Sequence, residues 1–161
     1  MTRIIITLVI LMSGVFSAYA QIGLEIDKIF SGRYSADPRV TETFMSGKNK
    51  YLIKNNLTVF ASFKGPSAVY SEELQRLVLA DGATAVGKNV RYKNGKLYFA
   101  FYILKPVKAG QKSINRYLYY LNMAPVGGTN VLVVYLEGSA SEKDVSSLIK
   151  GMANKENRKT K

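Results

Sequence analysis

The chain has 161 residues, with 23 Lys and Arg against 11 Asp and Glu, a formal net charge of +12, and no His, Cys or Trp. The absence of His and Cys excludes Ser-His-Asp and Cys-His nucleophiles and disulfides, as well as zinc, copper, haem or iron-sulfur sites of the usual ligand types. Any catalysis would rest on carboxylate, Lys, Tyr or Ser/Thr groups, and we expect no cofactor and no metal site.

The N-terminus has the order of a secretory signal peptide. Arg3 precedes an apolar run over residues 4–12, and small residues follow up to Ala20. This order predicts cleavage after Ala20 and a periplasmic or secreted protein. The apolar run is shorter than the roughly 20 residues that cross a bilayer, so we expect no transmembrane anchor after cleavage. Removing residues 1–20 takes away Arg3 and no acid, which leaves a net charge of +11 over 141 residues, the size of one domain.

Two apolar patterns define the first part of the mature chain. Apolar residues at helical spacing predict a short helix over residues 21–31, ended by Gly32. Alternation over Leu57–Lys64 predicts a half-buried strand that stops before Gly65-Pro66. Between them, residues 40–45 could form either a helical turn or a strand, and both alternatives stay open.

A longer helix is predicted over residues 71–82. Ser71 is a suitable N-cap, two glutamates follow it at the positive end of the helix dipole, and Gly82 ends the helix. The apolar stripe of this helix consists of Leu74, Leu77 and Val78.

Asn94-Gly95 predicts a two-residue type I′ hairpin between residues 86–93 and 96–104. Counting outward from this turn, the predicted cross-strand pairs are Lys93–Lys96, Tyr92–Leu97, Arg91–Tyr98 and Val90–Phe99. Alternation then assigns Val90, Tyr92, Leu97 and Phe99 to the buried face, and Arg91, Lys93, Lys96 and Tyr98 to the exposed face.

The remaining patterns complete a single α+β domain over residues 21–153. Residues 113–122 and 130–137 predict strands, and the second is apolar throughout Val131–Leu136, as expected of a central strand covered on both faces. Ser141 and Asp144 predict the capped start of a last helix, and residues 154–161 predict a basic disordered tail. We therefore expect a mostly antiparallel sheet of about five strands, with helices packed on one face.

One motif match fails on its context. Residues 82–89 nearly spell a phosphate-binding loop, but such a loop leaves a strand and opens a helix. Here a predicted helix precedes and a predicted strand follows, so we interpret the segment as a helix-to-strand turn.

The charge is segregated along the chain. The 55 residues from Gly82 to Leu136 contain no acid, eight bases and nine aromatic residues. Exposed bases beside tyrosines could bind anions by charge and planar groups by stacking. The candidate ligand-binding residues are Arg91, Lys93, Lys96 and Tyr98, with Tyr102 added by alternation.

These observations favour an exported, non-catalytic binding or accessory domain with an anionic partner. The candidate partners are acidic polysaccharide, lipid head groups and another envelope protein, while export disfavours nucleic acid.

Three alternatives stay open. Lys and Tyr on an exposed sheet are also typical of edge protection and solubility. The chain could be an envelope structural component whose strand edge joins a partner or a second copy. Least favoured is an enzyme that uses carboxylates or Tyr on glycans.

Four short segments resemble small exported domains of unknown function from Bacteroidetes-type bacteria: Ile26-Asp27-Lys28-Ile29-Phe30, Gly32-Arg33-Tyr34, Val40-Thr41-Glu42 and Leu57-Thr58-Val59-Phe60. The resemblance covers residues 22–150. It implies a secreted or periplasmic α+β domain, and it implies no activity, ligand or site residue.

Overall fold

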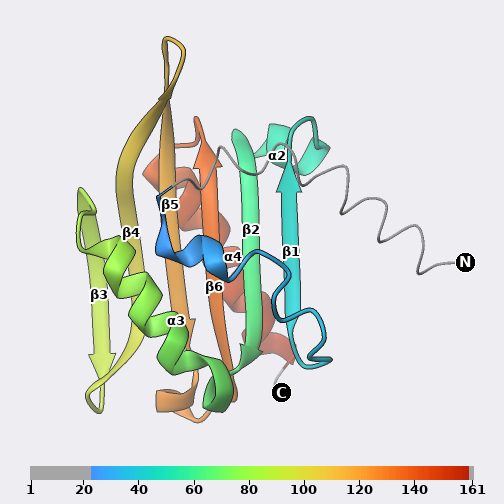
Figure 1. Cartoon of the computed structure of the whole chain (residues 1–161), viewed down its shortest axis with the longest axis vertical. Helices are drawn as coiled ribbons and strands as arrows, with labels where there is room; N and C mark the ends of the chain where they lie inside the picture. Colours follow the sequence, from blue (N-terminus) through green and yellow to red (C-terminus); the bar gives the residue numbers. More distant parts are fainter. Residues whose placement is uncertain (1–22, 160–161) are drawn as a thin grey trace, which may run out of the picture.

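Six antiparallel strands form one open sheet in the order β1-β2-β6-β5-β4-β3 (Figure 1). The computed structural model describes residues 23–159, and the predicted signal peptide lies outside the described residues. The strands are β1 (Thr41–Ser46), β2 (Leu57–Pro66), β3 (Gly87–Lys93), β4 (Lys96–Ala109), β5 (Lys112–Asn122) and β6 (Asn130–Gly138). An antiparallel α+β fold is thus confirmed. Of the two alternatives for residues 40–45, the structure shows a strand, which begins at Thr41 and brings the sheet to six strands.

The central strand is β6, which lies between β2 and β5. Successive side chains of a strand point to opposite faces, so Val133 belongs to the hydrophobic core on one face and Val134 to the core on the other. Both side chains have no exposed surface. The prediction that Val131–Leu136 is covered on both faces is confirmed for this pair.

Helix α3 (Ser67–Gly82) covers one face of the sheet (Figure 1). Its buried stripe includes Leu74, Leu77 and Val78, as the spacing predicted. The helix begins at Ser67 rather than after the predicted cap at Ser71. Pro66 ends β2, and the backbone N–H of Ser67 donates to the carbonyl of Thr129 at 2.8 Å. The first helical donor is therefore satisfied without a side-chain cap.

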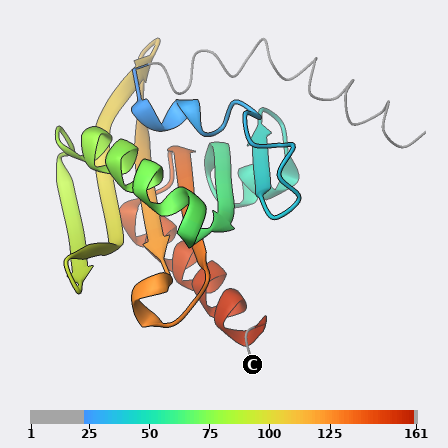
Figure 2. The same cartoon turned by 60° about the horizontal axis from the view of Figure 1, so that its bottom comes forward.

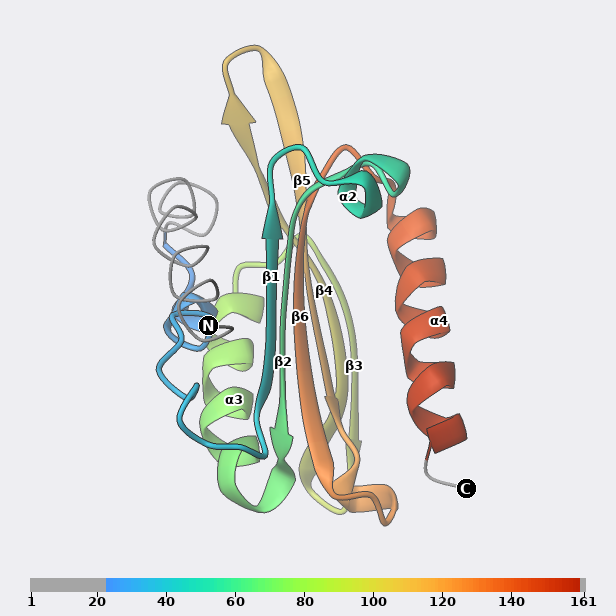
Figure 3. The same cartoon turned by 90° about the vertical axis from the view of Figure 1, so that its right-hand side faces the viewer.

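The N-terminal segment crosses the same face, beside α3 (Figures 1 and 3). The predicted helix over residues 21–31 is only a 3-10 turn, η1 (Glu25–Lys28). Gly23 and Gly32 bracket this turn with φ of +87° and +76°, and such left-handed residues break a helix. The apolar spacing was nevertheless informative, because Ile26 and Ile29 are fully buried against the α3 side of the sheet.

Helices α4 (Glu142–Lys159) and α2 (Lys50–Lys54) lie on the opposite face (Figure 3). The expectation that the helices pack on one face is therefore wrong. The strands carry apolar residues on both faces, and Phe60 and Leu136 are buried with the α4 residues Val145 and Ile149. A sheet with two apolar faces needs a cover on each.

The predicted disordered tail is also wrong for residues 154–159, because these residues continue α4. Ser141 and Asp144 cap the start of the helix as expected: the Ser141 hydroxyl donates to the Asp144 carboxylate at 2.7 Å, and the Asp144 N–H donates back at 3.2 Å. No proline follows to stop the helix.

The β4–β5 hairpin projects beyond the rest of the sheet (Figure 3). Strand β4 continues through Lys105-Pro106, where the sequence predicted its end. The pairing of β4 with β5 shifts register between Leu104 and Val107, and such an irregularity accommodates a proline within a strand. Within residues 23–159, no helix has the length and hydropathy needed to cross a membrane.

Candidate functional site

A groove of about 670 Å³ lies between the middle of α4, from Ser146 to Ala153, and the sheet. We call it the α4 groove. Its floor comes from β4, β5 and β6, one rim from β3, and one wall from the connection between β5 and β6, which includes the 3-10 turn η2 (Ala124–Val126). Figure 2 shows this connection below the sheet, close to the end of α4. The volume falls in the usual range of small-molecule sites.

An irregularity in the β3–β4 hairpin determines which side chains reach the groove. Asn94 and Gly95 have φ of +52° and +73°, as the predicted type I′ turn requires. The first two cross-strand pairs are as predicted, but the register then shifts, and Arg91 pairs with Phe99 instead of Tyr98. A bulge of this kind changes the face of every residue after it.

The bulge places Arg91 and Phe99 on the same face. The Arg91 guanidinium carbon lies 5.4 Å from the centroid of the Phe99 ring, a cation–π arrangement. Both residues line the α4 groove, together with Tyr98. An exposed arginine held over an aromatic ring keeps its N–H donors directed outward while its flat face is covered.

The floor of the groove is aromatic and aliphatic. The rings of Phe99 and Tyr119 meet edge to face with centroids 5.6 Å apart. Leu121 and Leu132 lie beside them and are only partly buried. Burial raises the pKa of the Tyr119 phenol well above its ordinary value, and the nearby Tyr98 adds to the rise. The Tyr119 phenol therefore stays neutral and adds no negative charge to the floor.

The wall formed by the β5–β6 connection is held by internal hydrogen bonds. The buried amide oxygen of Asn122 accepts from the Ser67 hydroxyl at 2.9 Å and from the Ala124 N–H at 3.1 Å. A Cβ on Gly128 would come within 2.4 Å of the Met123 Cβ. This close approach requires glycine at position 128. The hydrogen bonds and the close packing hold the β5–β6 connection against the sheet.

The charges of the described residues that line the groove have one sign. Its formally charged lining residues are Lys64, Arg91 and Lys150, and no acidic residue is among the described residues that line it. Arg91 and Lys150 form no ion pair with any described residue, since the ion pairs between described side chains all involve residues 25–39. The positive charges of Arg91 and Lys150 beside an apolar floor attract anions.

The structure separates the five predicted site residues. Arg91 and Tyr98 line the groove, whereas Lys93 and Lys96 flank the exposed turn outside the lining. Tyr102 is only 3% exposed and packs in the α3-side core. The prediction that Tyr102 shares the exposed face is wrong, because the bulge breaks the simple alternation from the turn along β4.

The sequence prediction missed the groove residues outside the hairpin, above all Lys150 on α4. Its position depends on which face of the sheet α4 covers. Because every residue of Val131–Leu136 is apolar, the sequence already indicated that both faces of the sheet are buried. The last helix was the available element to pack on the second face.

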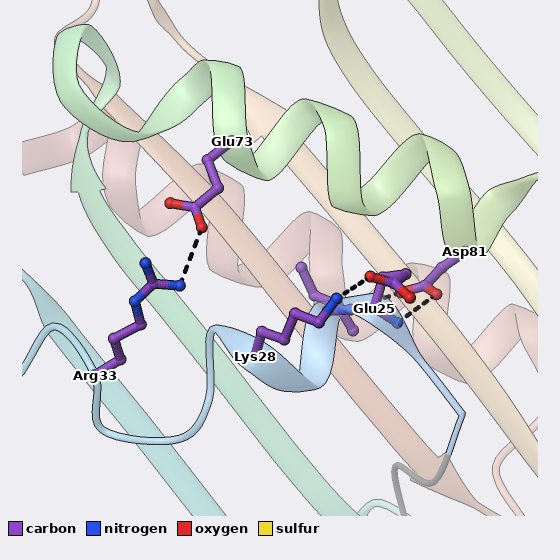
Figure 4. A network of polar contacts seen from close by, with 6 residues as sticks. Glu25, Lys28, Arg33, Glu73 and Asp81 are labelled. Atoms are coloured by element: carbon purple, nitrogen blue, oxygen red, sulfur yellow. Dashed lines mark hydrogen bonds and ion pairs between the residues drawn. The ribbon is translucent and has the colours of Figure 1, made fainter.

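A second polar cluster lies on the α3 face (Figure 4). The Asp81 carboxylate accepts hydrogen bonds from the backbone N–H groups of Glu25 and Ile26, at 2.7 and 2.8 Å. Burial raises the pKa of Asp81, although these two hydrogen bonds oppose the rise. Nearby, the Tyr34 hydroxyl donates to Glu73 at 2.5 Å. Each group already has a local partner, so the cluster holds the N-terminal segment on α3.

The segment that resembles a phosphate-binding loop is a turn between α3 and β3. The ammonium group of Lys88 donates to the carbonyl of Ala83 at 3.0 Å, so this lysine closes the turn.

The fold and the groove define a small α+β domain with a six-stranded antiparallel sheet and a cationic, apolar-floored groove beneath its last helix. The chain belongs to the DUF6108 family, a family of unknown function, which matches residues 13–149. No curated protein and no solved structure matches the chain.

Proposed function

We propose that the protein is an exported, non-catalytic binding domain that takes an anionic ligand in the α4 groove, with Arg91 and Tyr98 at the rim. The observation that carries the proposal is the pairing of an apolar floor with rim cations, of which Arg91 and Lys150 have no ion-pair partner among the described residues. The groups available at the groove are guanidinium, ammonium, phenol, amide and hydroxyl, which are suited to recognition of carboxylate, phosphate or sulfate.

Lys93 and Lys96 have a different role in this proposal. They flank the exposed turn outside the lining of the groove. Their charges attract an anion over a distance of about one Debye length, roughly 10 Å at 0.1 M salt, without contacting the bound ligand. Binding should therefore depend strongly on Arg91 and weakly on the two lysines.

The experiment measures the affinity of the purified protein for two anionic probes, each with a neutral control. The probes are phosphatidylglycerol-containing vesicles against phosphatidylcholine vesicles, and dextran sulfate against dextran. We expect at least one anionic probe to bind, with an affinity that falls between 50 and 300 mM salt and falls at least fivefold in Arg91→Gln. The matched control is Lys93→Gln on the same strand, which should change binding less than twofold. Salt-independent binding, or no binding to either anionic probe, contradicts the proposal.

Export rests on the order of charge, apolar run and small residues over residues 1–20. The resemblance to exported domains of Bacteroidetes-type bacteria supports the same proposal. Fractionation of cells that express the chain, followed by N-terminal sequencing, tests it. We expect a mature protein that begins at Gln21 in the periplasm or the medium. A protein found only in the cytoplasm with Met1 intact contradicts export.

A second candidate is an envelope interaction component that pairs through a sheet edge. The observation in its favour is β1, an edge strand of six residues without Lys, Arg or Pro, although proteins commonly protect edges with such residues. Sedimentation of the purified protein tests it. A concentration-dependent mass that Thr43→Lys abolishes favours this candidate, and a constant monomer mass argues against pairing with a second copy.

A further inference from the structure

We propose that the ligand of the α4 groove is a single-chain anionic amphiphile of the alkyl carboxylate class. This inference rests on the proposed function and narrows its ligand. In this arrangement the carboxylate lies at the rim beside Arg91, and the hydrocarbon chain lies along the floor beneath α4.

The floor argues for a hydrocarbon chain rather than a sugar. Leu121, Leu132 and Ile149 contribute aliphatic surface from two strands and the helix, and Phe99 and Phe101 add aromatic surface. A bound glycan would place hydroxyl groups against Leu121, Leu132 and Ile149, whose side chains offer no partners for hydrogen bonds, and this is costly. A hydrocarbon chain instead removes apolar surface from water on both sides of the contact.

The distribution of polar groups argues for a single anionic head. Apart from Tyr98 and Tyr119, the polar lining residues come from the elements around the apolar floor: Lys64 on β2, Asn89 and Arg91 on β3, Thr129 before β6, Asn130 at its first residue, and Ser146 and Lys150 on α4. The Arg91 guanidinium lies over the Phe99 ring, and a planar guanidinium matches a carboxylate with two parallel hydrogen bonds. The exposed Arg91 therefore lies beside the apolar floor of the α4 groove. An amphiphile has the matching arrangement, a charged head group beside an apolar chain.

The enclosure of the groove also fits one chain. The sheet forms the floor, α4 covers one side, and the wall built around Met123 and Gly128 closes another. A volume of about 670 Å³ accommodates a small molecule. We infer that the protein binds one amphiphile molecule at a time.

Calorimetric titration of the purified protein with octanoate, decanoate and dodecanoate, below their micelle concentrations, tests this inference. Each added methylene that enters the groove should strengthen binding about fourfold. 1-Decanol and decylammonium serve as neutral and cationic controls of equal length. We expect both to bind at least tenfold more weakly than decanoate, and we expect Arg91→Gln to weaken decanoate binding at least fivefold, toward the level of 1-decanol.

Two variants fill the α4 groove without changing its charge. Ala153→Phe and Ser146→Phe each add a ring from α4 at a position that lines the groove, and either should abolish the dependence on chain length. Asn154→Phe is the matched control, because Asn154 is exposed on the same helix and lies outside the lining. Circular dichroism identifies any variant that fails to fold, and the other filling variant then decides.

The outcomes separate this inference from the proposed function. If dextran sulfate or phosphatidylglycerol binds through Arg91 but the carboxylates show no dependence on chain length, the proposed function holds and the inference of an amphiphilic ligand is wrong. That inference is also wrong if 1-decanol binds as tightly as decanoate, or if both filling variants bind decanoate normally. If no anion, decanoate included, shows binding that depends on salt and on Arg91, both proposals fail.

Discussion

The two faces of the sheet are covered in different ways. On the α3 face, the helix and the N-terminal segment together bury the strands, and Tyr34, Phe63 and Tyr70 form a cluster of edge-to-face rings with centroids 5.1 to 5.6 Å apart. On the α4 face, α4 and the short α2 are the main cover, and Leu121 and Leu132 remain partly exposed in the groove.

Polar groups follow the same division. Asp81, Glu73 and Asp37 on the α3 face each accept hydrogen bonds from the N-terminal segment or from α3. Arg91 and Lys150 beside the α4 groove have no such partners among the described residues. The polar groups of the α3 face are paired within the chain and mainly stabilise the fold, whereas under the proposed function Arg91 and Lys150 on the α4 face interact with a ligand. We therefore expect that stability and binding can be changed separately.

The largest expected effect on the free energy of unfolding comes from replacing a leucine with alanine on α3, compared with the same replacement on α4. Leu77 on α3 is 1% exposed, whereas Leu148 on α4 is only partly buried. Leu77→Ala leaves a closed cavity and should lower the free energy of unfolding by about 3 kcal/mol, and Leu148→Ala, beside solvent, by about 1 kcal/mol. Urea denaturation measures both values. Equal losses would mean that the two faces are packed equally well.

The next effect concerns carboxylates that accept hydrogen bonds from backbone N–H groups. Asp81→Ala leaves two N–H groups of the N-terminal segment without an acceptor and should cost about 2 kcal/mol. Asp144→Ala removes an exposed capping interaction at the start of α4 and should cost about 1 kcal/mol. Urea denaturation gives both losses.

Hydrogen exchange provides the control for the Asp81 variant. The amides of Glu25 and Ile26 should exchange faster in Asp81→Ala and normally in Asp144→Ala. If they stay protected in Asp81→Ala, Asp81 does not hold the N-terminal segment on α3.

The sequence predicted the features that depend on neighbouring residues. The apolar stripe of α3, the Asn94-Gly95 turn and the Ser141 cap each arise from contacts within a few residues. The interior strand assignment of β6 was also predictable, because every residue of Val131–Leu136 is apolar.

The errors concern contacts between distant segments. The bulge in the β3–β4 hairpin lets Leu97 and Ala100 both pack on the α3-side core, and no residue near the turn indicates it. The same bulge moved Tyr102 into the core and Phe99 to the groove. The face covered by α4 is likewise set by long-range packing, so Lys150 could not be assigned to the site from the local pattern.

A smaller effect on stability is expected from the buried Glu137, on the α3 side of β6. Burial raises the pKa of this carboxyl, while the Tyr135 hydroxyl at 2.7 Å and the charge of Arg116 oppose the rise. A raised pKa means that the folded state favours the protonated acid. Its contribution to stability is complete below the ordinary pKa of about 4.3 and is lost as the pH rises through the folded pKa.

Glu137→Gln tests this direction, because the amide oxygen can still accept from Tyr135 but does not titrate. The free energy of unfolding of the wild type, relative to the variant, should fall between pH 4 and pH 7. Urea denaturation across this range measures the difference. A difference that rises with pH would show that Tyr135 and Arg116 outweigh burial.

The smallest effect on stability, and the sharpest separation of the two roles, is expected on α4 itself. Lys150 lines the groove, whereas Lys155 is exposed on the same helix outside the lining. Lys150→Gln and Lys155→Gln remove the same charge from surface positions, so each should change the free energy of unfolding by less than about 0.5 kcal/mol. Only Lys150→Gln should weaken decanoate binding, by between about 1.5-fold and fivefold at 50 mM salt. Equal weakening by both variants would mean that the net charge of the helix, and not the groove, attracts the anion.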